Sequence, residues 1–335
     1  MIKTILSVEN YYDIFTKDNF KKEYLGMISK LHPDKCKDEL ASQAAAKLNM
    51  FYAEAKIASK HNAWKSSKQI LTIDLEKSTI EIKYRYATKT EVGNMYVSDS
   101  LVTFTFNKEK FYKNFLDSLS FVSYKDENMK KYFSQFLPNV KRSFKDTHNI
   151  YYIILSKQKQ VYPLSLVADI FSQKEHAAWV LTRLLNLCVL FQQNNFSHCG
   201  IDLNSCFVDL RSHGIYLLGG WQFATKHDNK LSATTKKIFD NLPPSIKASK
   251  ISNPLIDIES TKFLVKELLK ANSLMQLEKV CGKEMAQFLF STINSSFVSL
   301  DELKRWEHAR SKTFSKHEFV VIDAKTSESI YKKGC

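Results

Sequence analysis

Two apolar stripes of helical spacing, separated by a proline, constrain the fold of the N-terminal part of the chain. The first stripe recurs at intervals of four, four and three residues, which predicts an amphipathic helix over residues 19–31. Its members are Phe20, Tyr24, Ile28 and Leu31. Pro33 cannot continue this helix, and it disfavours helical angles at His32, so the sequence predicts a loop there.

A second apolar stripe follows the loop, and its spacing is again helical. Its members are Ala41, Ala44, Ala45, Leu48, Phe51, Tyr52 and Ala55. Asp38 is placed to cap the start of this helix. Two antiparallel helices joined by a short polar loop form a helical hairpin, which is too small to be more than a module of the protein.

The tripeptide His-Pro-Asp at positions 32–34 lies between the two predicted helices, with Tyr24 before it and Asn49 and Tyr52 after it. This arrangement resembles the J domain of DnaJ-type co-chaperones. The segment NYYDIF is similar to the first short helix of that family, NFKKEYLGMISKLHPDKC to its second helix and signature loop, and KLNMFYAEAK to its third helix. The resemblance covers residues 1–67 and implies a DnaK-type heat-shock chaperone as partner, whose ATP hydrolysis the domain stimulates.

The chemistry of this loop suits a docking role. Proline stiffens the turn, the aspartate offers an anionic acceptor to a cationic partner, and the neighbouring lysines form an electropositive flank. Such a flank steers the chain toward an acidic surface and makes docking dependent on salt. The residues expected to bind the chaperone are His32, Pro33, Asp34, Lys21, Lys22, Tyr24, Lys30 and Lys35.

The N-terminal part departs from the J-domain pattern at two positions. Leu25 and Gly26 stand where the family commonly has arginine and lysine, and the glycine costs the helix about 1 kcal/mol. After Trp64 there is no glycine- and phenylalanine-rich linker and no zinc-binding cysteine module. The resemblance therefore leaves most of the chain, and the partner's exact type, unexplained.

The remaining residues predict an α+β body in which strands come first and helices follow. Alternating apolar residues predict an antiparallel sheet over residues 69–108. Helices are expected at residues 110–119 and 127–136, with a short apolar strand at 150–155. Residues 177–193 are apolar nearly all round, which predicts a buried helix.

The segment FSHCGIDLNSCFVDLRSHGIYLLGGWQFA follows this buried helix and contains two predicted short strands, residues 206–209 and 215–218. It resembles the catalytic loop and metal-binding segment of the protein-kinase-like fold, which read H-x-D-x-x-x-x-N and D-F-G. Farther along, NPLIDIESTKFLVKELL is similar to the helix whose aspartate braces the catalytic loop. The corresponding positions in this chain are His198, Gly200, Ser205, Gly219 and Asp257.

This second resemblance implies a degenerate kinase. Glycine replaces the catalytic aspartate and the metal-binding aspartate, and serine replaces the metal-binding asparagine, so the usual phosphoryl transfer loses its base and its magnesium ligands. Asp202 is a possible displaced base, although the metal site would stay empty. The expected architecture is a J domain at residues 1–67, a kinase-like N-lobe at 68–156 and a mainly helical C-lobe at 157–335.

Other site chemistries in this region have weaker support. His198, Cys199, Cys206 and His213 form an alternative zinc ligand set, but their spacing matches no standard zinc motif. A cysteine in a presumed core strand usually acts as a small apolar residue. No metal or cofactor is expected.

The composition of the chain limits which partners and which cell compartment are expected. The formal net charge of +14 suits nucleic acid, an anionic membrane or an acidic protein groove, but the basic residues are dispersed, so nucleic-acid binding is a minor alternative. Six irregularly spaced cysteines and no C-x-x-C motif favour a reducing compartment.

The N-terminus lacks a signal-peptide core and no segment predicts a membrane span, so a cytoplasmic protein without membrane contact is expected. Many lysines and asparagines beside few glycines and prolines are typical of AT-rich genomes, such as those of some viruses.

The leading functional hypothesis from sequence is a J-domain co-chaperone that is not itself an enzyme. Its kinase-like body would select an unknown protein client or anchor the assembly. The alternatives are an active or nucleotide-binding kinase-like phosphotransferase and, third, a basic nucleic-acid-binding protein.

Overall fold

The computed structural model describes residues 1–8, 10–16, 19–32, 36, 38–60, 64, 69–293, 295–314 and 330. Contacts divide the chain into two compact units. The first, the helical unit, comprises Met1–Leu71, Ile82–Tyr86 and Glu328–Cys335, and the second, the body, comprises Thr72–Glu81 and Ala87–Ser327. Each unit is described by itself below.

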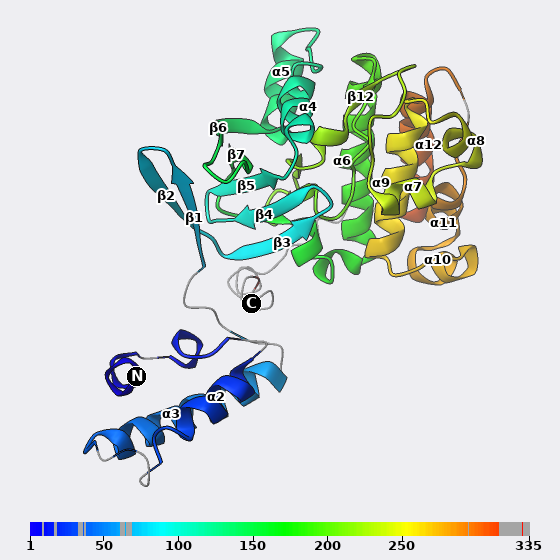
Figure 1. The fold of residues 1–335 in the computed structure, drawn as a ribbon. Helices are drawn as coiled ribbons and strands as arrows, with labels where there is room; N and C mark the ends of the chain where they lie inside the picture. Colours follow the sequence, from blue (N-terminus) through cyan, green and yellow to red (C-terminus); the bar gives the residue numbers. More distant parts are fainter. Residues whose placement is uncertain are drawn as a thin grey trace. The chain divides into compact units, whose positions relative to one another are not determined.

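The helical unit contains the predicted hairpin (Figure 1). Its helices are α1 (Ile2–Ser7), η1 (Tyr11–Asp13), α2 (Phe20–Ile28) and α3 (Ala41–Lys60). The first predicted helix ends earlier than expected, because residues 29–31 continue as a turn. At the start of α3, Asp38 Oδ1 accepts a hydrogen bond from the Leu40 backbone N–H at 2.9 Å, and the Asp38 carbonyl accepts one from Ala41 N–H. The capping role predicted for Asp38 is thus supported.

The apolar stripes of α2 and α3 form the core of the helical unit. Leu48 and Phe51 of α3 are fully buried, and Phe20 of α2 is buried beside them in the same core. The ring of Tyr11 meets Trp64 edge-on, with ring centroids 5.1 Å apart, so residues beyond α3 complete this core. Both stripes therefore face the same interior, as their spacing predicts.

Gly26 offers a test of how α2 is stabilised. It lies inside α2, it is exposed, and a Cβ added there would meet no atom within 4 Å. Gly26→Ala is expected to stabilise the helix by about 0.5–1 kcal/mol, because alanine loses less conformational entropy on folding. Amide hydrogen exchange of the full chain measures this as severalfold slower exchange in α2. Unchanged or faster exchange there would contradict the expectation.

The body contains a five-stranded sheet with strand order β3-β4-β5-β7-β6 among its described residues. The strands are β3 (Tyr86–Thr90), β4 (Gly93–Val97), β5 (Leu101–Phe106), β6 (Asn139–Lys145) and β7 (Tyr151–Ser156). Strand β5 pairs antiparallel with both β4 and β7, and β7 pairs antiparallel with β6. A separate two-stranded sheet joins β1 (Ile70–Leu75) and β2 (Ser78–Lys83).

The central strands of the sheet are the most apolar. Five of the six residues of β5 and the four inner residues of β7 are buried, whereas β6 is mostly exposed. The helix α4 (Glu109–Leu119) follows β5, and α5 (Glu127–Phe133) and η2 (Ser134–Phe136) lead into β6. The helix predicted at residues 127–136 is thus a short α-helix followed by a 3₁₀ turn.

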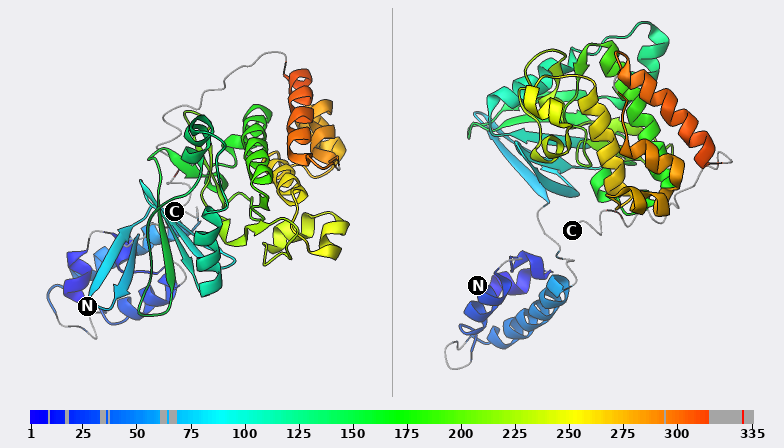
Figure 2. Two further views of the ribbon diagram at one scale, coloured as in Figure 1. Left: turned by 90° about the horizontal axis from the view of Figure 1, so that it is seen from above. Right: turned by 90° about the vertical axis from the view of Figure 1, so that its right-hand side faces the viewer.

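The rest of the body is mainly helical. Its short strands are β8 (Val161–Pro163), β9 (Phe196–Ser197), β10 (Cys206–Asp209), β11 (Ile215–Leu217) and β12 (Thr225–Lys226). Its helices are η3 (Leu164–Leu166), η4 (Ile170–Ser172), α6 (Lys174–Gln193), η5 (Trp221–Phe223), α7 (Lys236–Asn241), α8 (Pro244–Ser249), α9 (Leu255–Leu268), α10 (Leu274–Cys281), α11 (Lys283–Phe290) and α12 (Val298–Thr313). The helices, green to orange, gather on one side of the cyan sheet (Figure 2).

Helix α6 is the centre of this helical region. It packs against α9 and α12, and eleven of its residues are buried, which confirms the buried helix predicted from its apolar surface. Strand β10 pairs with β11 on one side and β8 on the other, at the place where two strands were predicted. The mixed α+β class of the body is therefore confirmed. The sequence also predicts that the apolar stretch at residues 319–322 adds a strand or packs on the C-lobe, but this stretch lies outside the described residues.

Within the described part of the chain, none of the helices combines the length and the apolar character that crossing a bilayer requires.

Candidate functional site

The structure brings together the three aromatic and polar residues that the J-domain resemblance singled out. The Tyr24 hydroxyl donates a hydrogen bond to Asn49 Oδ1 at 2.8 Å, and the rings of Tyr24 and Tyr52 stack with centroids 3.9 Å apart. Tyr24 comes from α2, and both of its partners come from α3. Tyr24 is half-buried, so it serves as a clamp that fixes the angle between the two helices.

The lysines of α2 and of the turn after it form an exposed basic face. Lys21, Lys22 and Lys30 are exposed, and so is His32 at the end of the turn after α2. The predicted binding residues Pro33, Asp34 and Lys35 lie outside the described residues. Leu25 shares the outer face and is 63% exposed, which makes the centre of this surface apolar and its flanks cationic.

In the body, Asp257 braces the segment that resembles a catalytic loop. Asp257 lies in the first turn of α9 and accepts backbone hydrogen bonds from His198 N–H at 2.7 Å and from Cys199 N–H at 2.9 Å. The side chains of Asp257 and His198 are buried. Burial raises the pKa of Asp257 to about 7 and lowers the pKa of His198 to about 3. The predicted bracing contact is therefore present.

The raised pKa of Asp257 leads to a pH-dependent prediction. Because this carboxyl binds protons more tightly when folded, its contribution to stability is full below its unfolded pKa of 3.8 and is lost as the pH rises through about 7. From pH 4 to pH 7, the free energy of unfolding of Asp257→Asn should gain up to about 4 kcal/mol relative to the native chain. The difference in free energy of unfolding between the two proteins also has a part that does not change with pH, because the asparagine amide accepts fewer hydrogen bonds than a carboxylate.

Urea unfolding at several pH values measures this difference. Comparison with the native chain is required because His198 has the opposite effect: its lowered pKa makes stability fall as the pH drops below its usual 6.5. The comparison cancels that contribution, since His198 is present in both proteins. A difference that stays constant from pH 4 to pH 7 would contradict the assignment.

Glycines stand at two positions that the kinase resemblance assigns to carboxylates, Gly200 for the catalytic base and Gly219 for a metal ligand. A Cβ added at Gly200 would lie 2.7 Å from the Gly220 carbonyl oxygen, and one at Gly219 would lie 3.0 Å from the Ser205 Cα. Backbone atoms thus fill the space that larger side chains would take. Ser205 Oγ donates instead to the Asp202 carbonyl at 3.0 Å, so its hydroxyl serves the local turn.

An aromatic pair that the sequence did not reveal lies next to Gly219. Phe104 of β5 and Phe115 of α4 have ring centroids 5.9 Å apart, and both are buried. A Cβ at Gly219 would lie 3.2 Å from the Phe104 ring, so this ring borders the glycine directly.

The residues of the alternative zinc set do not form a metal site. Among the described residues, no group of three or more histidine, cysteine, aspartate or glutamate side chains is arranged to hold a metal ion. His213 Nε2 instead lies 3.1 Å from His176 Nδ1, within a buried cluster. Burial raises the pKa of Cys199 and Cys206, which makes them inert apolar residues.

Tryptophan rings can stack on nucleic-acid bases, but two tryptophans of the body have a structural role instead. Trp221 and Trp306 are fully buried. Their indole N–H groups donate to the Leu217 carbonyl and to Thr182 Oγ1, each at 2.8 Å. These two rings are therefore not available to stack on a nucleic-acid base.

Comparison with known proteins gives a fold-level likeness. No protein-family model matches the sequence, and no curated protein matches it. Among solved structures, the structure of vaccinia related kinase 3 is similar to this chain, with a TM-score of 0.47 and 11% identity. The match covers 84% of this chain and 94% of that chain. The likeness concerns the fold, and no activity follows from it.

Proposed function

We propose that the protein is a J-domain co-chaperone that recruits a DnaK-type chaperone and stimulates its ATPase. The observation that carries this proposal is the clamp of Tyr24 against Asn49 and Tyr52, because it holds α2 and α3 as a hairpin. The clamp leaves the lysines of α2 exposed beside His32. A cationic surface next to a stiff turn suits docking to an acidic protein groove.

We further propose that the body binds a protein client or anchors the assembly and does not transfer phosphate. Phosphoryl transfer needs carboxylate or amide ligands for magnesium and a lysine on the phosphates. Here Gly200 stands at the position of the catalytic base, and Ser205 and Gly219 stand at the two magnesium-ligand positions. The ring of Phe104 borders Gly219. Backbone atoms lie so close to both glycines that an aspartate at either position would be crowded against them.

The proposed docking surface is tested by reversing its charge. Lys21→Glu combined with Lys22→Glu is expected to weaken binding to a purified DnaK-type chaperone at least tenfold, because two attractive charges become repulsive. Isothermal titration in the presence of ATP measures the affinity of the full chain. Raising the salt concentration should weaken the native complex and reduce the difference between the two proteins.

Lys159→Glu combined with Lys279→Glu is the matched control, since both lysines are exposed and belong to the body. This pair changes the net charge by the same amount, so equal weakening by both pairs would show only a general charge effect. That outcome would overturn the assignment of the docking surface to α2.

A further inference from the structure

A cavity of about 280 Å³ lies in the body, between the sheet and the loop that Asp257 braces. It is lined by residues of β5, by Gly200 and Gly219, and by Gln222 of η5. Gln222 is only 7% exposed, and its Oε1 has no hydrogen-bond partner among the described residues. A buried amide oxygen without a donor is unfavourable, so this oxygen favours a ligand that supplies one.

A second acceptor in the same cavity carries a negative charge. Asp202 lines the cavity, and its Oδ1 accepts hydrogen bonds from Asn204 N–H at 2.8 Å and Ser205 N–H at 2.7 Å. These contacts fix the carboxylate in place. Burial nevertheless raises the pKa of Asp202, so the carboxylate is short of solvation and a cation beside it would be favourable.

The basic residues that line the cavity do not neutralise this carboxylate by direct pairing. Lys237 forms an ion pair with Glu267, and Lys89 is exposed to solvent. The Glu91 carboxylate accepts a hydrogen bond from the Lys236 backbone N–H at 3.0 Å. Among the described residues, the Asp202 carboxylate thus has no direct ion pair with a lysine of the cavity lining.

The remaining walls are apolar and aromatic. Val92, Phe104, Phe106 and Phe223 line the cavity, and each is less than a tenth exposed. Typical ligand pockets measure about 300–1,000 Å³, so this cavity is small for a nucleoside triphosphate. A fixed carboxylate also repels phosphate groups.

We propose that this cavity binds a small organic cation, an ammonium or amidinium group attached to a flat apolar body. The cationic head donates to the Asp202 carboxylate and the Gln222 amide oxygen, and the apolar body packs on the phenylalanine walls. Charge-assisted hydrogen bonds of this kind are stronger than those between neutral groups. This proposal goes beyond the chaperone function and does not depend on the helical unit.

Benzamidine is the probe, and benzamide is its uncharged counterpart of similar shape. Isothermal titration of the full chain is expected to show benzamidine binding at least tenfold tighter than benzamide. Asp202→Asn should remove this preference while keeping an oxygen for both backbone donors. Gln222→Glu adds a second carboxylate and should tighten benzamidine binding severalfold, whereas Gln222→Leu should weaken it.

Two results would overturn the proposal. One is equal affinity for benzamidine and benzamide in the native chain, including no binding of either at millimolar concentration. The other is an unchanged benzamidine preference in Asp202→Asn, provided that thermal unfolding shows the variant to be folded. A titration with ATP and magnesium serves as a third arm: binding of ATP that competes with benzamidine and tightens in Asp202→Asn would assign the cavity to a phosphate ligand instead.

Discussion

Glu302→Gln is expected to lower the free energy of unfolding of the body by about 3–5 kcal/mol, because it leaves a buried lysine without its counter-charge. Lys262 of α9 and Glu302 of α12 form an ion pair at 2.7 Å between Nζ and Oε2, and the two side chains are 1% and 0% exposed. Few substitutions in the body should have a larger effect, since water cannot replace the lost partner.

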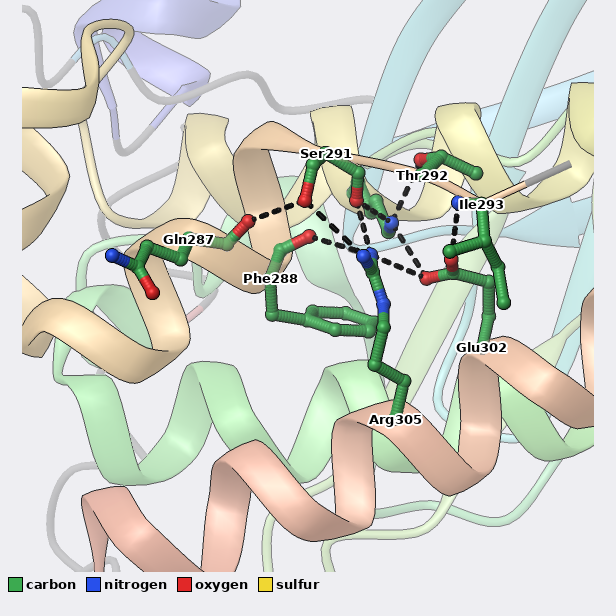
Figure 3. Close-up of polar contacts among 8 residues, drawn as sticks. Gln287, Phe288, Ser291, Thr292, Ile293, Glu302 and Arg305 are labelled. Carbon is green, nitrogen blue, oxygen red and sulfur yellow. Dashed lines mark hydrogen bonds and ion pairs between the residues drawn. The ribbon is translucent and has the colours of Figure 1, made fainter.

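The surrounding contacts explain why this pair is tolerated in the interior (Figure 3). Lys262 Nζ also donates to the Ser291 carbonyl at 2.6 Å and to Thr292 Oγ1 at 2.7 Å. Glu302 Oε1 accepts from the Ile293 backbone N–H at 2.8 Å, and Arg305 donates to Oε2 at 2.9 Å. Burial still lowers the pKa of Lys262 to about 8, which shows how strongly the site disfavours an uncompensated charge.

The matched control is Asp169→Asn, which removes a carboxylate from an exposed ion pair. Asp169 lies 2.7 Å from Lys270, but the two side chains are 84% and 67% exposed. Exposed pairs contribute about 0–1 kcal/mol, so this variant should unfold almost like the native chain. Urea unfolding followed by circular dichroism measures both. Equal, small losses in the two variants would contradict the role assigned to the buried pair.

The elements with strong local patterns could be predicted from sequence. The stripes of α2 and α3 and the apolar surface of α6 each define an element through spacing alone. The bracing contact of Asp257 was predicted from the order of motifs, and the backbone hydrogen bonds to His198 and Cys199 are present.

Other features depend on contacts that local patterns do not carry. Strand β6 is an edge strand with five of its seven residues exposed, so it shows little apolar alternation. The Phe104–Phe115 pair and the Lys262–Glu302 pair join residues from different elements, and a lone phenylalanine or lysine gives no sign of its partner. The unpaired amide oxygen of Gln222 likewise cannot be predicted from sequence, because it depends on how the surrounding chain buries this side chain.

His32→Gln is the second substitution with a large expected effect, this time on function. His32 lies at the exposed end of the turn after α2, beside the basic face that the clamp of Tyr24 positions. Glutamine keeps a polar side chain of similar length but cannot reproduce the imidazole, so the docking turn is altered with little change to the core. We expect it to reduce stimulation of a DnaK-type ATPase at least tenfold and to leave the stability of the chain unchanged.

The most direct test of the co-chaperone proposal is single-turnover ATP hydrolysis by a DnaK-type chaperone, with the full chain, with His32→Gln and with Asp34→Asn. The proposal predicts faster hydrolysis with the native chain and the basal rate with either variant, although thermal unfolding shows both variants to be folded. Hydrolysis at the basal rate with all three proteins, or equal stimulation by all three, would contradict the proposal.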